Sequence, residues 1–125
     1  MSFLATWQFW VVVSLLIISG ISKAIQDTLM FHFETSVFKN TNPNFWDPNK
    51  SWQNKYLISN NKFISWLFQN PLVSLTDGWH LFGLIRNFTM FASIPVISGN
   101  WWLFLLYPIF TGTFHIFFTW IFKTK

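Results

Sequence analysis

The sequence predicts an all-α integral membrane protein, a compact three-helix bundle that forms a single membrane domain over residues 1–125. Three observations lead to this fold class. The chain is 52% hydrophobic and only 10% charged, whereas an ordinary soluble domain is about 25% charged. Its 17 Phe and 9 Trp residues carry more aromatic surface than a soluble protein of this length buries. Residues 1–22 and 87–122 contain no Asp, Glu, Lys or Arg, and a helix needs about 20 apolar residues to cross a bilayer.

The first span is expected over about residues 3–24, with the uncharged run Phe3–Ser22 as its core. No Gly or Pro occurs between Ser22 and Pro43, so we expect the helix to continue past the bilayer to about Val37. This extension is predicted to be amphipathic. Its two stripes are Lys23, Asp27 and Glu34 on one side and Leu29, Phe33 and Val37 on the other.

Residues 39–71 are predicted to form a cytoplasmic segment at the membrane interface. The stretch Lys39–Tyr56 holds two prolines and many Asn residues, so we expect a loop. Asn61–Pro71 is apolar but too short to span, which predicts an interfacial or re-entrant helix. Aromatic side chains alternate with lysines in the loop, a pattern typical of headgroup depth beside anionic lipid. The predicted interfacial residues are Trp46, Trp52 and Tyr56, with Lys50 and Lys55 between them.

The second and third spans are expected over about residues 72–98 and 101–122. Pro95 falls in the last turn of the second span, and Ser98-Gly99-Asn100 predicts a tight turn between the two. The third span begins with a Trp pair and is followed by lysines at the C-terminus.

The distribution of lysine predicts the orientation of the spans. The connection between the first two spans and the C-terminus carry all the flanking lysines, namely Lys39, Lys50, Lys55, Lys62, Lys123 and Lys125. With three spans these two segments fall on the same side of the membrane, and lysine-rich segments stay in the cytoplasm. We therefore expect a bacterial inner (cytoplasmic) membrane protein with the N-terminus outside, Asn100 facing outward and the C-terminus inside.

Polar residues near the cytoplasmic ends of the spans form one predicted cluster, made of Lys23, Asp27, Asp77, His80, Arg86 and His115. Asp77 and His80 are three residues apart and so face the same way on a helix. His115 lies about 10 Å above the cytoplasmic end of the third span at 1.5 Å per residue. His80 lies at a similar depth in the second span. The polar stripes can therefore meet.

Three interpretations of this cluster compete. In the favoured one, polar groups turn inward and hold the helices together by hydrogen bonds, with Asp77 paired to Lys23 or Arg86 and His80 bonded to Thr or Tyr hydroxyls. In the second, Asp77, His80 and His115 bind Zn or Fe, joined by Asp27 or His32. In the third, the cluster carries protons or ions. The spacing Asp-x-x-His is far less specific than His-Glu-x-x-His, so no metal and no cofactor is favoured.

Arg86 needs a partner of its own. It lies about 180° from Asp77 around an ideal helix, which excludes an ion pair within that helix. An unpaired guanidinium in lipid is costly. The residue therefore favours contact with another helix, a lipid phosphate or a partner subunit.

Three stretches carry a resemblance, namely "FHFETSVF", "FWDPNKSWQNKY" and "LTDGWHLF". In this order they resemble a group of small, uncharacterised multi-span membrane proteins of bacteria and phages. Members of that group share FHF-x-x-S-x-F, then FW(D/N)P-x-x-SW-x-NKY, then TD-x-WHLF before apolar spans. The resemblance covers about residues 24–85 and implies the order of the segments. It implies no activity.

Together these observations favour a non-enzymatic polytopic membrane protein that self-assembles or serves as an accessory subunit of a membrane complex. The alternative is a metal-dependent membrane enzyme that acts on a lipid-borne substrate through an Asp/His site at the cytoplasmic side. Membrane lipid is the expected partner, and no nucleic-acid signature is present.

Overall fold

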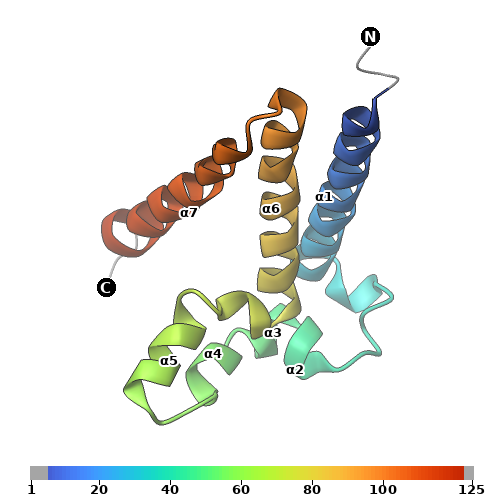
Figure 1. The fold of residues 1–125 in the computed structure, drawn as a ribbon. Helices are drawn as coiled ribbons and strands as arrows, with labels where there is room; N and C mark the ends of the chain where they lie inside the picture. Colours follow the sequence, from blue (N-terminus) through green and yellow to red (C-terminus); the bar gives the residue numbers. More distant parts are fainter. Residues whose placement is uncertain (1–5, 123–125) are drawn as a thin grey trace. The chain divides into compact units, whose positions relative to one another are not determined.

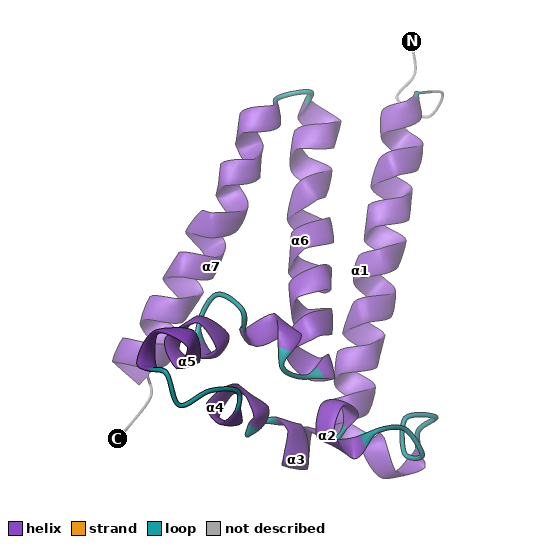
Figure 2. Cartoon of the chain, turned by 60° about the horizontal axis from the view of Figure 1, so that its bottom comes forward, coloured by secondary structure: helices purple, strands orange, loops and turns teal. Residues whose placement is uncertain are grey.

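The computed structural model describes residues 6–122, and this part of the chain is helical throughout, with turns but no β-strand (Figure 2). The predicted all-α fold is therefore confirmed. Three helical segments are long and apolar enough to cross a membrane: Trp7–Phe31, Gly78–Ser98 and Trp101–Phe122. The predicted span starting at Phe3 and the predicted cytoplasmic Lys123 and Lys125 extend beyond the described residues.

The chain divides into two compact units, which are described separately. One unit is continuous and runs from Ile18 to Arg86. The other combines the described residues of the ranges 1–17 and 87–125. Helices α1 (Trp7–Phe31) and α6 (Gly78–Ser98) each contribute to both units (Figure 1).

In the continuous unit, residues 18–31 of α1 and 78–86 of α6 lie side by side and antiparallel (Figure 1). The Ser19 hydroxyl donates to the Arg86 carbonyl at 2.9 Å. About two helical turns further along α1, the Gln26 amide donates to the Trp79 carbonyl at 2.9 Å. Both pairs advance by seven residues, in opposite chain directions. The end of α1 and the start of α6 therefore lie at the same end of this unit.

The contact face of α1 is more polar than its composition suggests. Ser19, Ser22 and Gln26 are all buried, followed by Leu29, which is 1% exposed. Their spacing of three and four residues is the seam spacing of packed helices. Small hydroxyl side chains let helix backbones approach closely and form hydrogen bonds across the contact.

Helix α1 ends earlier than predicted. It stops at Phe31 and is followed by a 3₁₀ turn, η2 (Phe33–Thr35), so the expected continuation to Val37 is wrong. The Ser36 hydroxyl donates to the Phe33 carbonyl at 2.7 Å and accepts from the Phe38 amide at 3.2 Å. Such local side-chain bonds compete with the helical ladder and favour turns.

The predicted loop over residues 39–56 is also wrong, because three short helices form there. They are α2 (Pro43–Trp46), α3 (Pro48–Ser51) and α4 (Asn54–Leu57). Each proline occupies the first turn of its helix, where the missing N–H is not needed. The side chains of Asn42 and Asp47 cap the two helices that begin with proline.

The predicted short helix after this region is present as α5 (Lys62–Gln69), capped by the Asn61 side chain, which accepts from the Phe63 and Ile64 amides. A 3₁₀ turn, η3 (Val73–Leu75), then leads to α6. The helix of the second span therefore begins at Gly78, six residues after the first residue of the predicted range 72–98. The short helices gather at the end of the unit where α6 begins (Figures 1 and 2).

In the other unit, α6 ends with Pro95 in its last turn, and Gly99 adopts a positive φ of 73°, which confirms the predicted tight turn. The third span follows as η4 (Trp101–Leu105), α7 (Leu106–Ile116) and a π-helical end, η5 (Phe117–Phe122). Rings hold this span against α6: Phe88 stacks on Phe104 and meets Tyr107 edge-on, with centroids 6.5 and 5.8 Å apart.

Candidate functional site

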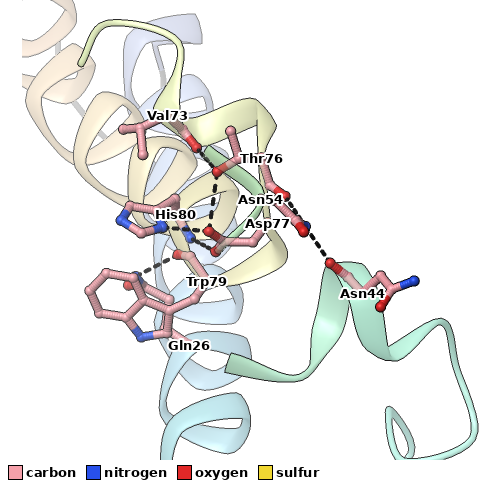
Figure 3. Close-up of polar contacts among 8 residues, drawn as sticks. All are labelled: Gln26, Asn44, Asn54, Val73, Thr76, Asp77, Trp79 and His80. Carbon is pink, nitrogen blue, oxygen red and sulfur yellow. Dashed lines mark hydrogen bonds and ion pairs between the residues drawn. The ribbon is translucent and has the colours of Figure 1, made fainter. Parts of the chain in front are cut away.

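Asp77 is the centre of a buried polar cluster in the continuous unit, and its first role is to cap α6 (Figure 3). The side chain is 2% exposed. Its Oδ1 accepts from the His80 amide at 2.9 Å, and its own carbonyl accepts from the Leu81 amide at 3.0 Å. A carboxylate at this position satisfies amides that have no partner in the helix and complements the positive end of the helix dipole.

His80 also contacts the Asp77 carboxylate through its imidazole ring. The Nδ1 atom lies 2.7 Å from Asp77 Oδ2. Since a carboxylate only accepts hydrogen bonds, Nδ1 carries a proton in this pair. The second ring nitrogen, Nε2, takes no part in the pair and points away from the carboxylate (Figure 3). The His80 side chain is 27% exposed, so the pair joins a buried carboxylate to a partly accessible imidazole.

Thr76 and Asn54 fix the backbone segment that precedes Asp77 through hydrogen bonds. The Thr76 hydroxyl donates to the Val73 carbonyl at 2.7 Å and lies 3.2 Å from Asp77 Oδ2. One hydroxyl proton serves one acceptor at a time, and the shorter contact is the one to Val73. The Asn54 amide donates both to the Thr76 carbonyl, at 2.9 Å, and to the Asn44 carbonyl. Asn54 therefore ties α4, α2 and the start of α6 together (Figure 3).

Two glycines let other elements approach this cluster closely. A Cβ atom on Gly78 would lie 2.9 Å from the Trp46 ring, and one on Gly83 would lie 2.7 Å from the Gln26 amide nitrogen. Trp46 is stacked on Phe82, with ring centroids 5.9 Å apart. The aromatic helix α2 and the polar face of α1 thus both pack against α6 at positions that have no side chain.

The predicted cluster residues take different places. Lys23 lies 2.8 Å from Asp27 in an exposed pair on α1, so it does not pair with Asp77 as hypothesised. The carbonyl of Arg86 accepts from Ser19. His80 bonds the Asp77 carboxylate rather than a Thr or Tyr hydroxyl. His115 is exposed on α7, which belongs to the other unit, and the convergence of the polar stripes stays a prediction.

The predicted interfacial rings also differ among themselves. Trp46 is half-buried and packs against Phe82 of α6. Trp52 and Tyr56 are 48% and 47% exposed and meet each other edge-on, with centroids 6.3 Å apart. Their depth at the membrane stays a prediction.

Sequence reasoning missed most of the residues that surround Asp77. Asn54 and Gln26 were not singled out because their side chains bond residues 22 and 53 positions away along the chain, and Thr76, whose hydroxyl bonds locally to Val73, was missed as well. One pattern could have predicted the contact face of α1. Polar residues are spaced three and four positions apart within an apolar span, at Ser19, Ser22 and Gln26.

The donor set of the cluster limits what it can bind. Asp77 has Oδ1 engaged by the His80 amide and Oδ2 by the His80 ring, which leaves His80 Nε2 as the accessible ligand atom. Within residues 6–122 no group of three or more His, Asp or Glu side chains is arranged to hold a metal ion. In this arrangement Asp77 orients the His80 ring through Oδ2 and the start of α6 through Oδ1.

A hollow lies at the end of α1. This hollow of about 350 Å³ is lined by residues 29–35 together with Pro48 and Asn49. His32 and Glu34 are the titratable residues of its lining. Glu34 lies 3.8 Å from Lys39 in an exposed ion pair, so its charge is already compensated.

Searches of protein-family models, curated proteins and solved structures yield no match to this chain. The three long apolar helices fit a small membrane protein.

Proposed function

We propose that this chain is a non-enzymatic polytopic protein of the bacterial inner membrane that works by assembly, either with copies of itself or as an accessory subunit of a larger membrane complex. The proposed orientation places the N-terminus outside and the connection between α1 and α6 in the cytoplasm, following the lysine distribution.

The observation that carries this proposal is the exposure of the third span. Trp101–Phe122 is long and apolar enough to cross a membrane, yet none of its most hydrophobic window is buried. The corresponding windows of α1 and α6 are 17% and 22% buried. Its own unit therefore covers little of this helix, which leaves an apolar surface for lipid or another protein to cover.

Polar groups on α7 favour protein over lipid as part of that cover. His115 is exposed on this helix. Thr111 and Thr113 donate their hydroxyls to the Pro108 and Ile109 carbonyls, so their polarity is satisfied locally. Unlike His80, His115 has no acidic residue within four positions along the chain, and a polar ring facing hydrocarbon is costly. Contact with a second chain would remove that cost.

Cross-linking through α7 tests the proposal. The chain has no cysteine, so Phe114→Cys, on an exposed position of α7, supplies a unique thiol. We expect oxidant-dependent dimers of this variant in native membranes, because copies would meet along α7. Ala92→Cys is the matched control, since that position is 5% exposed on α6 and should give no dimer. Absence of any cross-linked product at Phe114, with either a second copy or another chain, would contradict assembly through this helix.

A metal-dependent enzyme acting on a lipid-borne substrate is the second candidate, and one observation favours it. A carboxylate bonded to Nδ1 is how many metal-binding histidines are oriented, with Nε2 left to the metal. The Asp77–His80 pair has this form. The candidate needs two further ligands, for which the sequence predicts His115 together with Asp27 or His32.

Metal analysis of the purified protein separates the two candidates. We expect much less than one Zn or Fe per chain, unchanged in His80→Gln, because one accessible nitrogen does not make a stable site and at least three protein ligands are usual. A content near one ion per chain that is lost in His80→Gln and in His115→Gln would replace the assembly proposal by the enzymatic one.

A further inference from the structure

The segment that joins α1 to α6 has a one-sided charge. Between Asp47 and Asp77 the sequence contains no acidic residue, while it contains Lys50, Lys55 and Lys62. These lysines lie in or beside α3, α4 and α5. Lys23 and Lys39, by contrast, have acidic partners, Asp27 and Glu34. The three lysines of the joining segment therefore give it a net positive charge.

Helix α5 presents an apolar face beside these lysines. Phe63 and Trp66 are stacked, with ring centroids 6.4 Å apart, and are 66% and 54% exposed. Ile64 is 38% exposed and lies about 100° around the helix from Phe63. On a helical wheel Lys62, Ser65 and Gln69 fall within an arc of about 60° that borders Trp66 and lies opposite Phe63 and Ile64, and the Gln69 amide donates to the Ser65 hydroxyl at 2.6 Å. The helix is thus amphipathic, with its apolar face outward.

Helix α4 and the turn before it repeat the pattern. Trp52 and Tyr56 meet edge-on and are about half exposed. The Lys55 ammonium lies 5.2 Å from the centre of the Tyr56 ring. Rings with a polar edge, placed next to lysines, are the side chains that membrane interfaces select.

The fold holds these helices at one end of the long apolar helices. The contact between Gln26 and Trp79 brings the end of α1 close to the start of α6, so residues 32–77 leave and return at the same end of the continuous unit. Figures 1 and 2 show the short helices gathered there. If α1 and α6 cross a bilayer, this end lies at its surface.

We propose that α3, α4 and α5 form a docking surface for anionic phospholipid headgroups, with the exposed rings seated at the boundary of the leaflet and Lys50, Lys55 and Lys62 placed over its phosphates. The charge complementarity of an acid-free, lysine-bearing amphipathic segment with an anionic leaflet selects this occupant. The inference rests on the proposed membrane function and names the lipid class that the joining segment recognises.

A depth measurement on α5 tests the inference. Ile64→Cys carries a unique spin label and leaves the Phe63–Trp66 pair intact. The labelled protein is reconstituted into vesicles of phosphatidylcholine alone and of phosphatidylcholine with phosphatidylglycerol. We expect the label to become less accessible to a water-soluble nickel chelate in the anionic vesicles. Each lysine replaced by glutamine should lower the ratio of interfacial to water-exposed label roughly fivefold, and high salt should do the same.

Three controls separate the possible failures. Lys39→Gln, outside the surface and paired with Glu34, should leave the label depth unchanged. A label at Asn40→Cys, an exposed loop position, should stay in water in both lipids. A label at Ile109→Cys on α7 should report hydrocarbon in both. The lipid-docking inference is wrong, and the membrane proposal stands, if position 109 lies in hydrocarbon while position 64 stays in water. The same conclusion follows if the label at position 64 inserts equally in both lipids and in a variant with Lys50, Lys55 and Lys62 all replaced by glutamine. A water-exposed label at position 109 would contradict the membrane proposal itself.

Discussion

Asp77→Ala is expected to lower the free energy of unfolding by about 3 kcal/mol. The substitution removes the cap of α6, which is worth about 1 kcal/mol. It also leaves the His80 amide and the His80 Nδ1 without their acceptor, and an unsatisfied buried donor costs roughly 1–3 kcal/mol. Unfolding by SDS in bicelles, followed by far-UV circular dichroism, measures the change.

Two matched variants show whether the histidine contact contributes beyond capping. Asp47 caps α3 in the same way, accepting from the Asn49 amide at 3.0 Å, and is also buried, but its capping contact involves no histidine. Asp47→Ala should therefore cost only about 1 kcal/mol. Asp77→Asn keeps an oxygen for the His80 amide and should also cost about 1 kcal/mol. Equal losses for Asp77→Ala and Asp47→Ala would mean that the His80 ring contact adds no stability.

The long helices were predictable because their signal is local. An uncharged apolar run needs no knowledge of distant residues, and Trp101–Phe122 appears with the predicted bounds. The turn at Gly99 was predictable for the same reason, since glycine readily supplies the positive φ found there.

The ends of the helices were less predictable because single side chains decide them. A serine hydroxyl at Ser36 satisfies the Phe33 carbonyl and helps to stop α1. Pro43 and Pro48 begin helices rather than break them, since Asn42 and Asp47 precede them as caps. The same residue types in another order would make a loop, so composition alone gave the wrong prediction.

The site was predictable only within a single helical turn. The spacing of Asp77 and His80 predicted that they face the same way, and they are bonded at 2.7 Å. The rest depends on contacts across the chain. Asn54 reaches Thr76 from 22 residues away and Gln26 reaches Trp79 from 53. The periodicity of one helix carries no information about such partners. Lys23, which was expected to reach Asp77 on another helix, pairs with Asp27 one turn along its own helix.

Gly78→Ala is the second substitution with a large expected effect, a loss of about 2 kcal/mol. The added Cβ would lie 2.9 Å from Trp46 Cε3 and 3.4 Å from the Phe45 ring. The Trp46 ring cannot move away easily, because it is stacked on both Phe38 and Phe82, with centroids 4.9 and 5.9 Å apart. Overpacking of this kind costs about 1–3 kcal/mol.

Two glycines of the long helices with open surroundings, Gly20 and Gly112, provide the controls for this prediction. A Cβ on Gly20 or on Gly112 would meet nothing within 4 Å, so Gly20→Ala and Gly112→Ala should be neutral or stabilise by up to about 1 kcal/mol through helix propensity. A smaller ring should relieve the clash, and Gly78→Ala combined with Trp46→Phe should be less destabilised than the two single losses added together. The same SDS titration measures all five variants, with Trp46→Phe alone among them. A Gly78→Ala protein as stable as Gly20→Ala would show that Trp46 does not pack against the first turn of α6, and the aromatic contact between α2 and α6 would have to be abandoned.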